Sequence, residues 1–153
     1  PMQKITSNGE GSSLMKNPLQ IEKIVKAVSE ACGLPTTVKI RRGYEIGNES
    51  CVEAALAAEA GGAAAVTVHG RYRDEYYSGK SEISAIARVK AALKIPVIGN
   101  GDIISCETAL KMFKETGFCT KEALDKGIQK VIPAKKAAML GLNQEALKIG
   151  MES

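Results

Sequence analysis

Two rhythms of apolar and polar positions alternate along the first part of the chain. Short apolar runs rich in β-branched residues predict strands over 36–41, 64–69 and 95–99, as in the buried strands of parallel sheets. Apolar residues three and four positions apart predict helices around these strands. The predicted helices cover 18–32 and 49–60, a segment capped by Ser81 that reaches Leu93, and a segment capped by Ser105 and ended by Gly117. This alternation predicts an α/β fold with a parallel sheet.

The first helix has the clearest boundaries. Asn17 suits the N-cap, Pro18 suits the first helical position, and Gly33 follows the last apolar residue. The apolar residues of the helices are expected to face the core. These are Ile21, Ile24, Val25 and Val28 in the first helix, Val52, Ala55 and Leu56 in the second, and Ala109, Leu110 and Phe113 in the fourth.

A polar residue stands near the end of each predicted strand. Lys39, His69 and Asn100 are separated by 30 and 31 positions, and about 30 residues is the length of one strand–helix unit. Three such units in register predict a parallel barrel or a layered sheet. In both architectures the site lies at the carboxyl ends of the strands. This edge is therefore expected to carry Lys39, His69, Asn100 and Asp102 together.

The pattern changes after Gly117. Thr120 resembles another N-cap, helical spacing continues to Ile132, and Pro133 interrupts it. Residues 134–153 predict one or two short amphipathic helices rich in Lys and Ala, and no further strand is predicted. We therefore expect a domain over 1–118 and a helical tail over 119–153.

Composition narrows the picture only a little. The 153 residues carry a net charge of +4 with 44% hydrophobic residues, which is ordinary for one globular domain and compatible with a nucleic-acid partner. No apolar run approaches the roughly 20 residues of a membrane span, and we expect no signal peptide. The four cysteines form no CxxC pair and there is one histidine, so we expect no metal site, reduced thiols and a cytoplasmic location.

Each candidate residue has two interpretations. Lys39 could contact an electron-rich ring or a phosphate, or it could be a surface lysine. His69 could be catalytic or a hydrogen-bonded structural residue. The segment 99–102 could bind a phosphate through its backbone or form a simple turn. The loop 71–77, rich in Arg and Tyr, could contact RNA or be solvated.

Several motifs, taken in order, resemble the tRNA-dihydrouridine synthases. The resemblance covers residues 1 to about 118. The matching segments are Lys4-Ile5 with Asn8 to Met15, Val38-Lys39-Ile40-Arg41 with Gly43, Thr67-Val68-His69-Gly70-Arg71 with Arg73, Tyr77-Ser78-Gly79, and Pro96-Val97-Ile98-Gly99-Asn100-Gly101-Asp102-Ile103.

The resemblance implies a TIM (β/α)8-barrel flavoenzyme, of which this chain holds about three strand–helix units, barrel strands five to seven. It implies that FMN, reduced by NADPH, reduces uridine to dihydrouridine in tRNA. The residues implied to bind FMN are Lys39, His69, Asn100, Gly101 and Asp102. Arg71 and Arg73 are implied to lie at the tRNA substrate mouth.

The resemblance also has consequences for activity. The family's catalytic cysteine would directly precede Pro1, so no cysteine of this chain is given a catalytic role. The family's first four strands and the Gly-Arg pair of its eighth strand have no counterpart, and residues 119–153 do not resemble its RNA-binding domain. We therefore expect the chain alone to be inactive, and an open half-barrel with two free sheet edges to self-associate.

Two other functions are compatible with the residues. One is an FMN- or phosphate-binding barrel that acts on a small molecule. The other is a non-catalytic RNA-binding or interaction module, which the basic charge and the lysines of the tail permit. Salt-dependent tRNA binding without flavin would favour the second of these.

Overall fold

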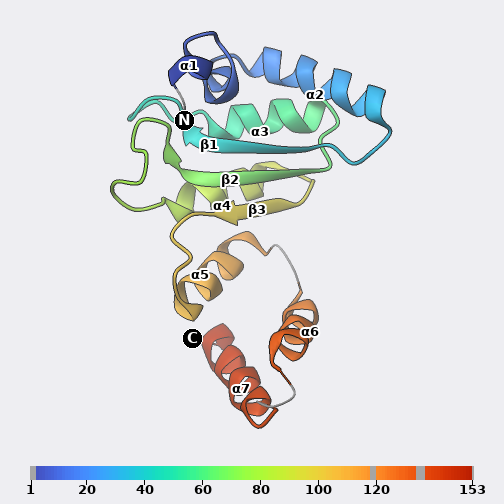
Figure 1. Cartoon of the computed structure of the whole chain (residues 1–153), viewed down its shortest axis with the longest axis vertical. Coiled ribbons are helices and arrows are strands. Elements are labelled where there is room, and N and C mark those ends of the chain that lie inside the picture. Colours follow the sequence, from blue (N-terminus) through green and yellow to red (C-terminus); the bar gives the residue numbers. More distant parts are fainter. Residues whose placement is uncertain (1–2, 118–119, 134–136, 153) are drawn as a thin grey trace. The chain divides into compact units, whose positions relative to one another are not determined.

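The fold is built on a three-stranded parallel sheet (Figure 1). The computed structural model describes residues 3–117, 120–133 and 137–152. The strands are β1 (Thr37–Gly43), β2 (Ala65–Tyr72) and β3 (Val97–Asn100), arranged in the order β1-β2-β3. Both pairings are parallel, which confirms the α/β prediction and is compatible with part of a TIM-barrel-like domain. The numbering of these strands as barrel strands five to seven stays a prediction.

Helices separate the strands, as the sequence predicts. They are α1 (Gln3–Thr6), the 3-10 helix η1 (Gly11–Lys16), α2 (Pro18–Cys32), α3 (Cys51–Ala60), α4 (Ile83–Ala92), α5 (Cys106–Thr116), α6 (Lys121–Val131) and α7 (Met139–Glu152). Within the described ranges, no strand follows β3 and no helix is both long and apolar enough to cross a membrane.

One face of the sheet is buried against helices and the other is polar. Helices α3 and α4 contact the sheet, and α2 packs on α3. Successive side chains of a strand point to opposite faces, so the apolar residues of each strand reach the helices together. The buried residues of this core include Ile40, Val66, Val68 and Val97 from the strands and Ala54, Ala55, Ala58, Ile86 and Val89 from the helices.

Local capping explains most helix boundaries. Asn17 accepts a hydrogen bond from the Gln20 backbone N–H at the start of α2, and Gly33 ends this helix in the left-handed region. The prediction for α4 is wrong in detail, because Glu82 caps this helix and Ser81 does not. The backbone N–H of Ser81 binds Asp102 instead. Strand β2 also extends to Tyr72, three residues beyond the predicted end.

Some residues predicted to face the core are exposed. Leu56 is 43% exposed, because α3 buries the stripe of Cys51, Ala54, Ala55 and Ala58. Ile24 and Val28 are 40% and 45% exposed. These two residues lie on α2 along a cavity beside β1 instead of in the core. Small side chains thus decide which face of α3 packs closely.

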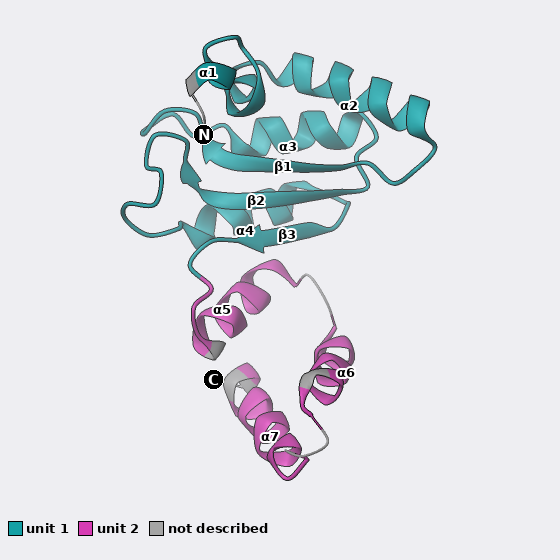
Figure 2. Cartoon of the chain, in the orientation of Figure 1, with its two compact units in different colours: residues 1–102 teal, residues 103–153 magenta. Residues whose placement is uncertain are grey.

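The chain forms two compact units, Pro1–Asp102 and Ile103–Ser153 (Figure 2). In the second unit, α5 and α6 each contact α7. Ser105 and Thr108 form a capping box at the start of α5, and Thr120 caps α6, as predicted.

Among the side chains of α5 that the structure describes, Met112, Phe113 and Thr116 are buried, whereas Ala109, predicted to face inward, is exposed. The predicted domain boundary between 118 and 119 lies outside the described residues and stays a prediction.

Replacement of Ile86 by Ala is expected to destabilise the first unit strongly. Ile86 is fully buried on α4, and truncation of a buried Ile leaves a cavity that costs about 2–5 kcal/mol. Urea unfolding followed by circular dichroism measures the loss. Ile104→Ala is the matched control, because Ile104 is 89% exposed. Equal losses in the two variants would show that the core is not where the structure places it.

Candidate functional site

Strand register and one side-chain hydrogen bond bring three predicted site residues together, although Lys39 itself lies opposite Thr67 in the register. His69 on β2 lies opposite Arg41 on β1 and opposite Asn100 on β3. The Lys39 Nζ donates a hydrogen bond to the Asn100 Oδ1 at 2.7 Å. The expectation that Lys39, His69 and Asn100 meet at one edge of the sheet is therefore correct. Their roles toward a ligand stay a prediction.

Positive charge dominates this edge. Burial lowers the pKa of His69, which is 8% exposed. The charges of Arg41, Lys39 and Arg71 lower the pKa of His69 further, and Asp102 acts against them. The pKa of Lys39 is also lowered, first by burial and then by Arg41. The polar edge is thus suited to a ligand that brings negative charge.

Arg71 is a buried arginine that connects the turn after β3 to the loop before α4. Its Nη1 and Nη2 donate to the two carboxylate oxygens of Asp102 at 2.7 and 3.0 Å. Its Nε and Nη2 also donate to the backbone carbonyls of Ser78 and Gly79. The Arg71 side chain is 6% exposed, because all three of its nitrogens bind the protein itself. Its expected place at the tRNA substrate mouth stays a prediction.

The ion pair between Arg71 and Asp102 also fixes the turn after β3. Asp102 accepts a hydrogen bond from the Ser81 backbone N–H at 2.6 Å, which is the largest cause of its lowered pKa, and Arg71 lowers this pKa further. Gly101 has φ +123°, and a Cβ there would lie 2.3 Å from the Ser81 Oγ and 3.0 Å from the His69 Cδ2. Only glycine fits this turn without displacing its neighbours. The turn therefore lies directly against His69.

Arg73 differs from Arg71 in its surroundings. Its guanidinium carbon lies 4.8 Å from the centre of the Tyr44 ring, and its Nη2 donates to the Thr6 Oγ1 at 3.4 Å. The sequence motifs single out Arg73 but not Tyr44. The position of Tyr44 could have identified it, because Tyr44 directly follows β1 just as Arg73 directly follows β2.

Arg41 is a second residue that the sequence argument missed. It lies two positions after Lys39 on β1 and therefore on the same face of the sheet. Its backbone N–H donates to the Met15 Sδ at 3.3 Å, and its Nη1 donates to the Tyr72 carbonyl at 3.1 Å. The period of two along a strand would have identified it.

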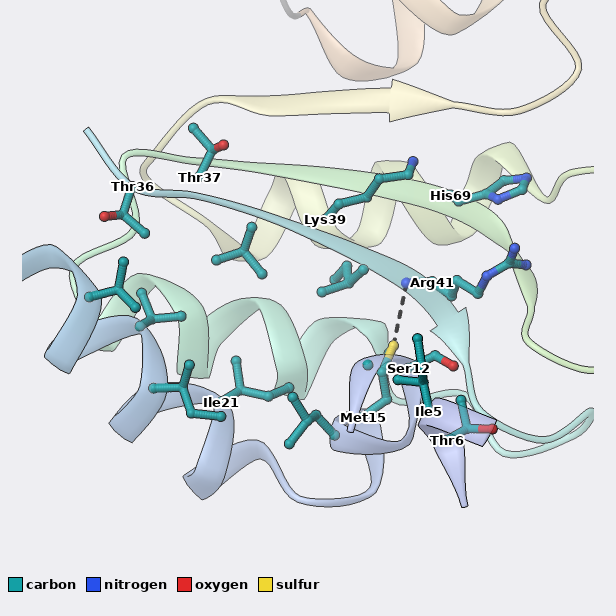
Figure 3. A pocket seen from close by; sticks show the side chains of 17 residues that line it. Ile5, Thr6, Ser12, Met15, Ile21, Thr36, Thr37, Lys39, Arg41 and His69 are labelled. Carbon is teal, nitrogen blue, oxygen red and sulfur yellow. Dashed lines mark hydrogen bonds between the residues drawn. The ribbon is translucent and has the colours of Figure 1, made fainter. Parts of the chain in front are cut away.

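A cavity of about 640 Å³ runs beside β1 (Figure 3). Lys39, Arg41 and His69 form a polar part of its lining, and Met15 and Ile21 belong to an apolar part. A cavity of this size, with an apolar wall and a few polar groups, is typical of cofactor sites.

The two cysteines with described side chains do not line this cavity. Cys51 is buried at the start of α3, and burial raises its pKa to about 11, which keeps the thiol protonated and unreactive. Cys32 is exposed at the end of α2. The side chains of Cys106 and Cys119 lie outside the described residues. In the described part of the chain, no three residues among His, Cys, Asp and Glu gather as a metal site would require.

The parallel sheet makes this an α/β protein, and proteins of this class generally bind ligands at the carboxyl ends of their strands. The family model described as "Dihydrouridine synthase (Dus)" matches residues 1–120. The chain therefore belongs to the dihydrouridine synthase family, and the resemblance inferred from the sequence motifs is confirmed.

Individual relatives agree with this assignment. "Probable tRNA-dihydrouridine synthase 1" of Synechocystis is 47% identical over 117 residues, which cover 76% of this chain and 33% of the relative. "tRNA-dihydrouridine synthase B" of Vibrio cholerae is 43% identical over 117 residues, 76% of this chain and 36% of the relative. The protein of the same name from Xanthomonas axonopodis is 41% identical over 117 residues, 76% of this chain and 35% of the relative. The chain spans about a third of the length of these curated relatives.

His69 is expected to titrate below its ordinary pKa of 6.5 and to be neutral at pH 7. It is the only histidine, so its ring signals in a proton–carbon NMR titration are unambiguous. Arg41→Ala is expected to move the midpoint upward, because Arg41 is the first of the charges that lower this pKa. A midpoint at or above 6.5 in the original chain would contradict the buried, cationic surroundings.

The same shift affects stability. The unfolded histidine binds its proton near pH 6.5, whereas the folded one binds it only at lower pH. The free energy of unfolding is therefore expected to fall as the pH falls below about 6.5. In His69→Asn this part of the pH dependence should be absent, while the losses caused by carboxylates at lower pH remain.

Proposed function

We propose that this chain provides part of the catalytic site of a tRNA-dihydrouridine synthase, which reduces uridine to dihydrouridine in tRNA with FMN as cofactor and NADPH as reductant. The observation that carries the proposal is the Lys39–Asn100 hydrogen bond beside His69. The bond reaches the carboxyl end of β3 at Asn100, and barrel enzymes hold their ligands at the carboxyl ends of their strands. The reaction itself is proposed from the names of the relatives, which are tRNA-dihydrouridine synthases.

The residues of this edge fit a flavin nucleotide. An ammonium, an amide, an imidazole and a glycine turn offer donors to the polar and anionic parts of such a ligand. When bound, FMN would supply the hydride chemistry that side chains lack. Lys39 would contact the flavin ring system, where its ammonium opposes the negative charge of the reduced ring. Asn100 and Gly101 would hold the ribityl chain and phosphate.

His69 would act as a neutral ring at this edge. A neutral imidazole has one donor and one acceptor nitrogen, and the lowered pKa of His69 favours this state at pH 7. It would therefore orient a polar group of the cofactor without adding a further positive charge. The close approach of the Gly101 turn to the ring supports a fixed orientation.

Arg71 and Asp102 would act indirectly. Their ion pair holds the turn after β3 and the loop before α4 together, so we assign both as positioning residues in this proposal. A carboxylate would repel a phosphate, which also argues against direct phosphate contact by Asp102. Arg73, whose guanidinium makes no ion pair within the described residues, would face the RNA.

Flavin binding tests the proposal directly. FMN titrated into the chain is expected to show saturable fluorescence quenching. In Lys39→Ala the affinity should fall at least about tenfold, because a hydrogen bond from a charged group contributes about 1.5–3 kcal/mol.

Lys94→Ala is the matched control for this titration. Lys94 is exposed and precedes β3, at the opposite edge of the sheet, so its loss should leave FMN affinity unchanged. Circular dichroism establishes that each variant is folded. Equal affinities in Lys39→Ala and the original chain, or quenching that never saturates, would refute the proposed role of this edge.

A further inference from the structure

A second hollow has a lining that does not include Lys39, His69 or Asn100. Each side chain of this lining carries a hydrogen-bond donor. The hollow has a volume of about 370 Å³ and is lined by Lys4, Thr6, Ser7, Tyr44 and Arg73. Thr6 also lines the larger cavity beside β1, where Figure 3 shows it on α1. The hollow therefore adjoins the proposed flavin site. We call these five residues the Arg73 subsite.

The strand ends hold this subsite in place. Tyr44 directly follows β1 and Arg73 directly follows β2. The Arg73 backbone N–H donates to the Gly43 carbonyl at 3.0 Å, which ties the two segments together. The Arg73 side chain is then fixed from two sides, by the Tyr44 ring and by the Thr6 hydroxyl. The position of its charge is thus set before any ligand arrives.

The charge of Arg73 is not neutralised within the described residues. Arg73 appears in none of their ion pairs, and its Nε is buried without a hydrogen-bond partner. Neither neighbouring acid forms an ion pair with Arg73. Glu45 pairs with Lys16, and the Asp74 Oδ2 accepts from the Ile46 backbone N–H, while the Asp74 Oδ1 is buried without a hydrogen-bond partner among the described residues. A partly desolvated, uncompensated guanidinium is costly, and an incoming anion would offset this cost.

The lining fits a phosphate better than a base. It contains an ammonium, a guanidinium and three hydroxyl groups, and no carboxylate. The ring of Tyr44 already has the Lys16 Nζ over it at 4.1 Å and the Arg73 guanidinium at 4.8 Å. Two cations therefore already lie over this ring, where a nucleobase would have to stack. A tetrahedral oxyanion, in contrast, accepts hydrogen bonds from an ammonium and a guanidinium such as those of Lys4 and Arg73. The Ser7 hydroxyl already donates to the Lys4 carbonyl.

We propose that the Arg73 subsite binds a backbone phosphate of the RNA strand, next to the nucleotide that enters the site at Lys39 and His69. This inference rests on the proposed function for the identity of the strand. Phosphate contacts fix the register of a nucleic acid without reading its sequence. The subsite would therefore position the strand, while the Lys39 edge holds the flavin.

Salt-dependent binding of tRNA tests this subsite. Fluorescence anisotropy with labelled tRNA, repeated at several salt concentrations, gives the affinity and its salt slope. Arg73→Gln is expected to weaken binding several-fold at about 0.1 M salt and to reduce the slope by about one unit, as loss of one phosphate contact requires. Lys4→Gln, at an exposed position, should act in the same direction. Lys94→Gln is the matched control and should change neither quantity.

A parallel FMN titration separates the two sources of phosphate. If Arg73→Gln weakens FMN binding and leaves the tRNA slope unchanged, the subsite holds the flavin phosphate and the inference is wrong. If Arg73→Gln and Lys4→Gln both keep the original slope, or if the chain binds no tRNA, the inference also fails. Loss of FMN binding in Lys39→Ala alone leaves it intact. A chain that binds tRNA through Arg73 but never binds FMN would refute the proposed function and support the subsite.

Discussion

Parallel pairing of β2 with a strand on each side is the constraint on which the site depends. The register places His69 opposite both Arg41 and Asn100. A slip of one residue would turn Val66 and Val68 out of the core toward the polar face. Packing against α3 and α4 therefore fixes the register, and the register in turn selects which polar side chains meet on the open face. Packing of the helices against one face of the sheet thus fixes the positions of the polar side chains on the other face.

The Arg71–Asp102 pair extends this order beyond the strands. Both carboxylate oxygens and three nitrogens take part, together with the Ser81 backbone N–H. A nearly buried guanidinium with all of its nitrogens bonded resists displacement much more than an exposed ion pair would. It fixes the loop before α4 and the Gly101 turn against His69. The polar edge is in this way supported by contacts that never need to touch a ligand.

Positively charged side chains line both the cavity beside β1 and the Arg73 subsite. Lys39, Arg41 and Arg71 surround His69, and Arg73 lies beside Lys4 in the neighbouring hollow. Burial, and after it the repulsion between neighbouring positive charges, lower the pKa of Lys39 and of His69. An anionic ligand would relieve this repulsion, and the same argument applies to a flavin phosphate and to an RNA backbone. The unit is thus arranged to receive negative charge along one edge.

Features set by local contacts could be predicted from the sequence. Caps such as Asn17, Ser105 and Thr120 need only a few neighbouring residues, and apolar periodicity places the three strands. The spacing of Lys39, His69 and Asn100 was enough to bring them to one edge, because each strand–helix unit returns the chain to the same side of the sheet.

Other features depend on partners that are distant in the sequence. Ser81 looks like a helix cap until Asp102 takes its backbone N–H. Arg71 and Arg73 belong to one motif, yet the first is buried in an ion pair with Asp102 and the second lies over the ring of Tyr44. The sequence by itself determined the alternating elements and the edge at which polar residues meet. Only the tertiary structure decided which arginine is already bonded to the protein, because this depends on the carboxylate or ring that the fold brings to each.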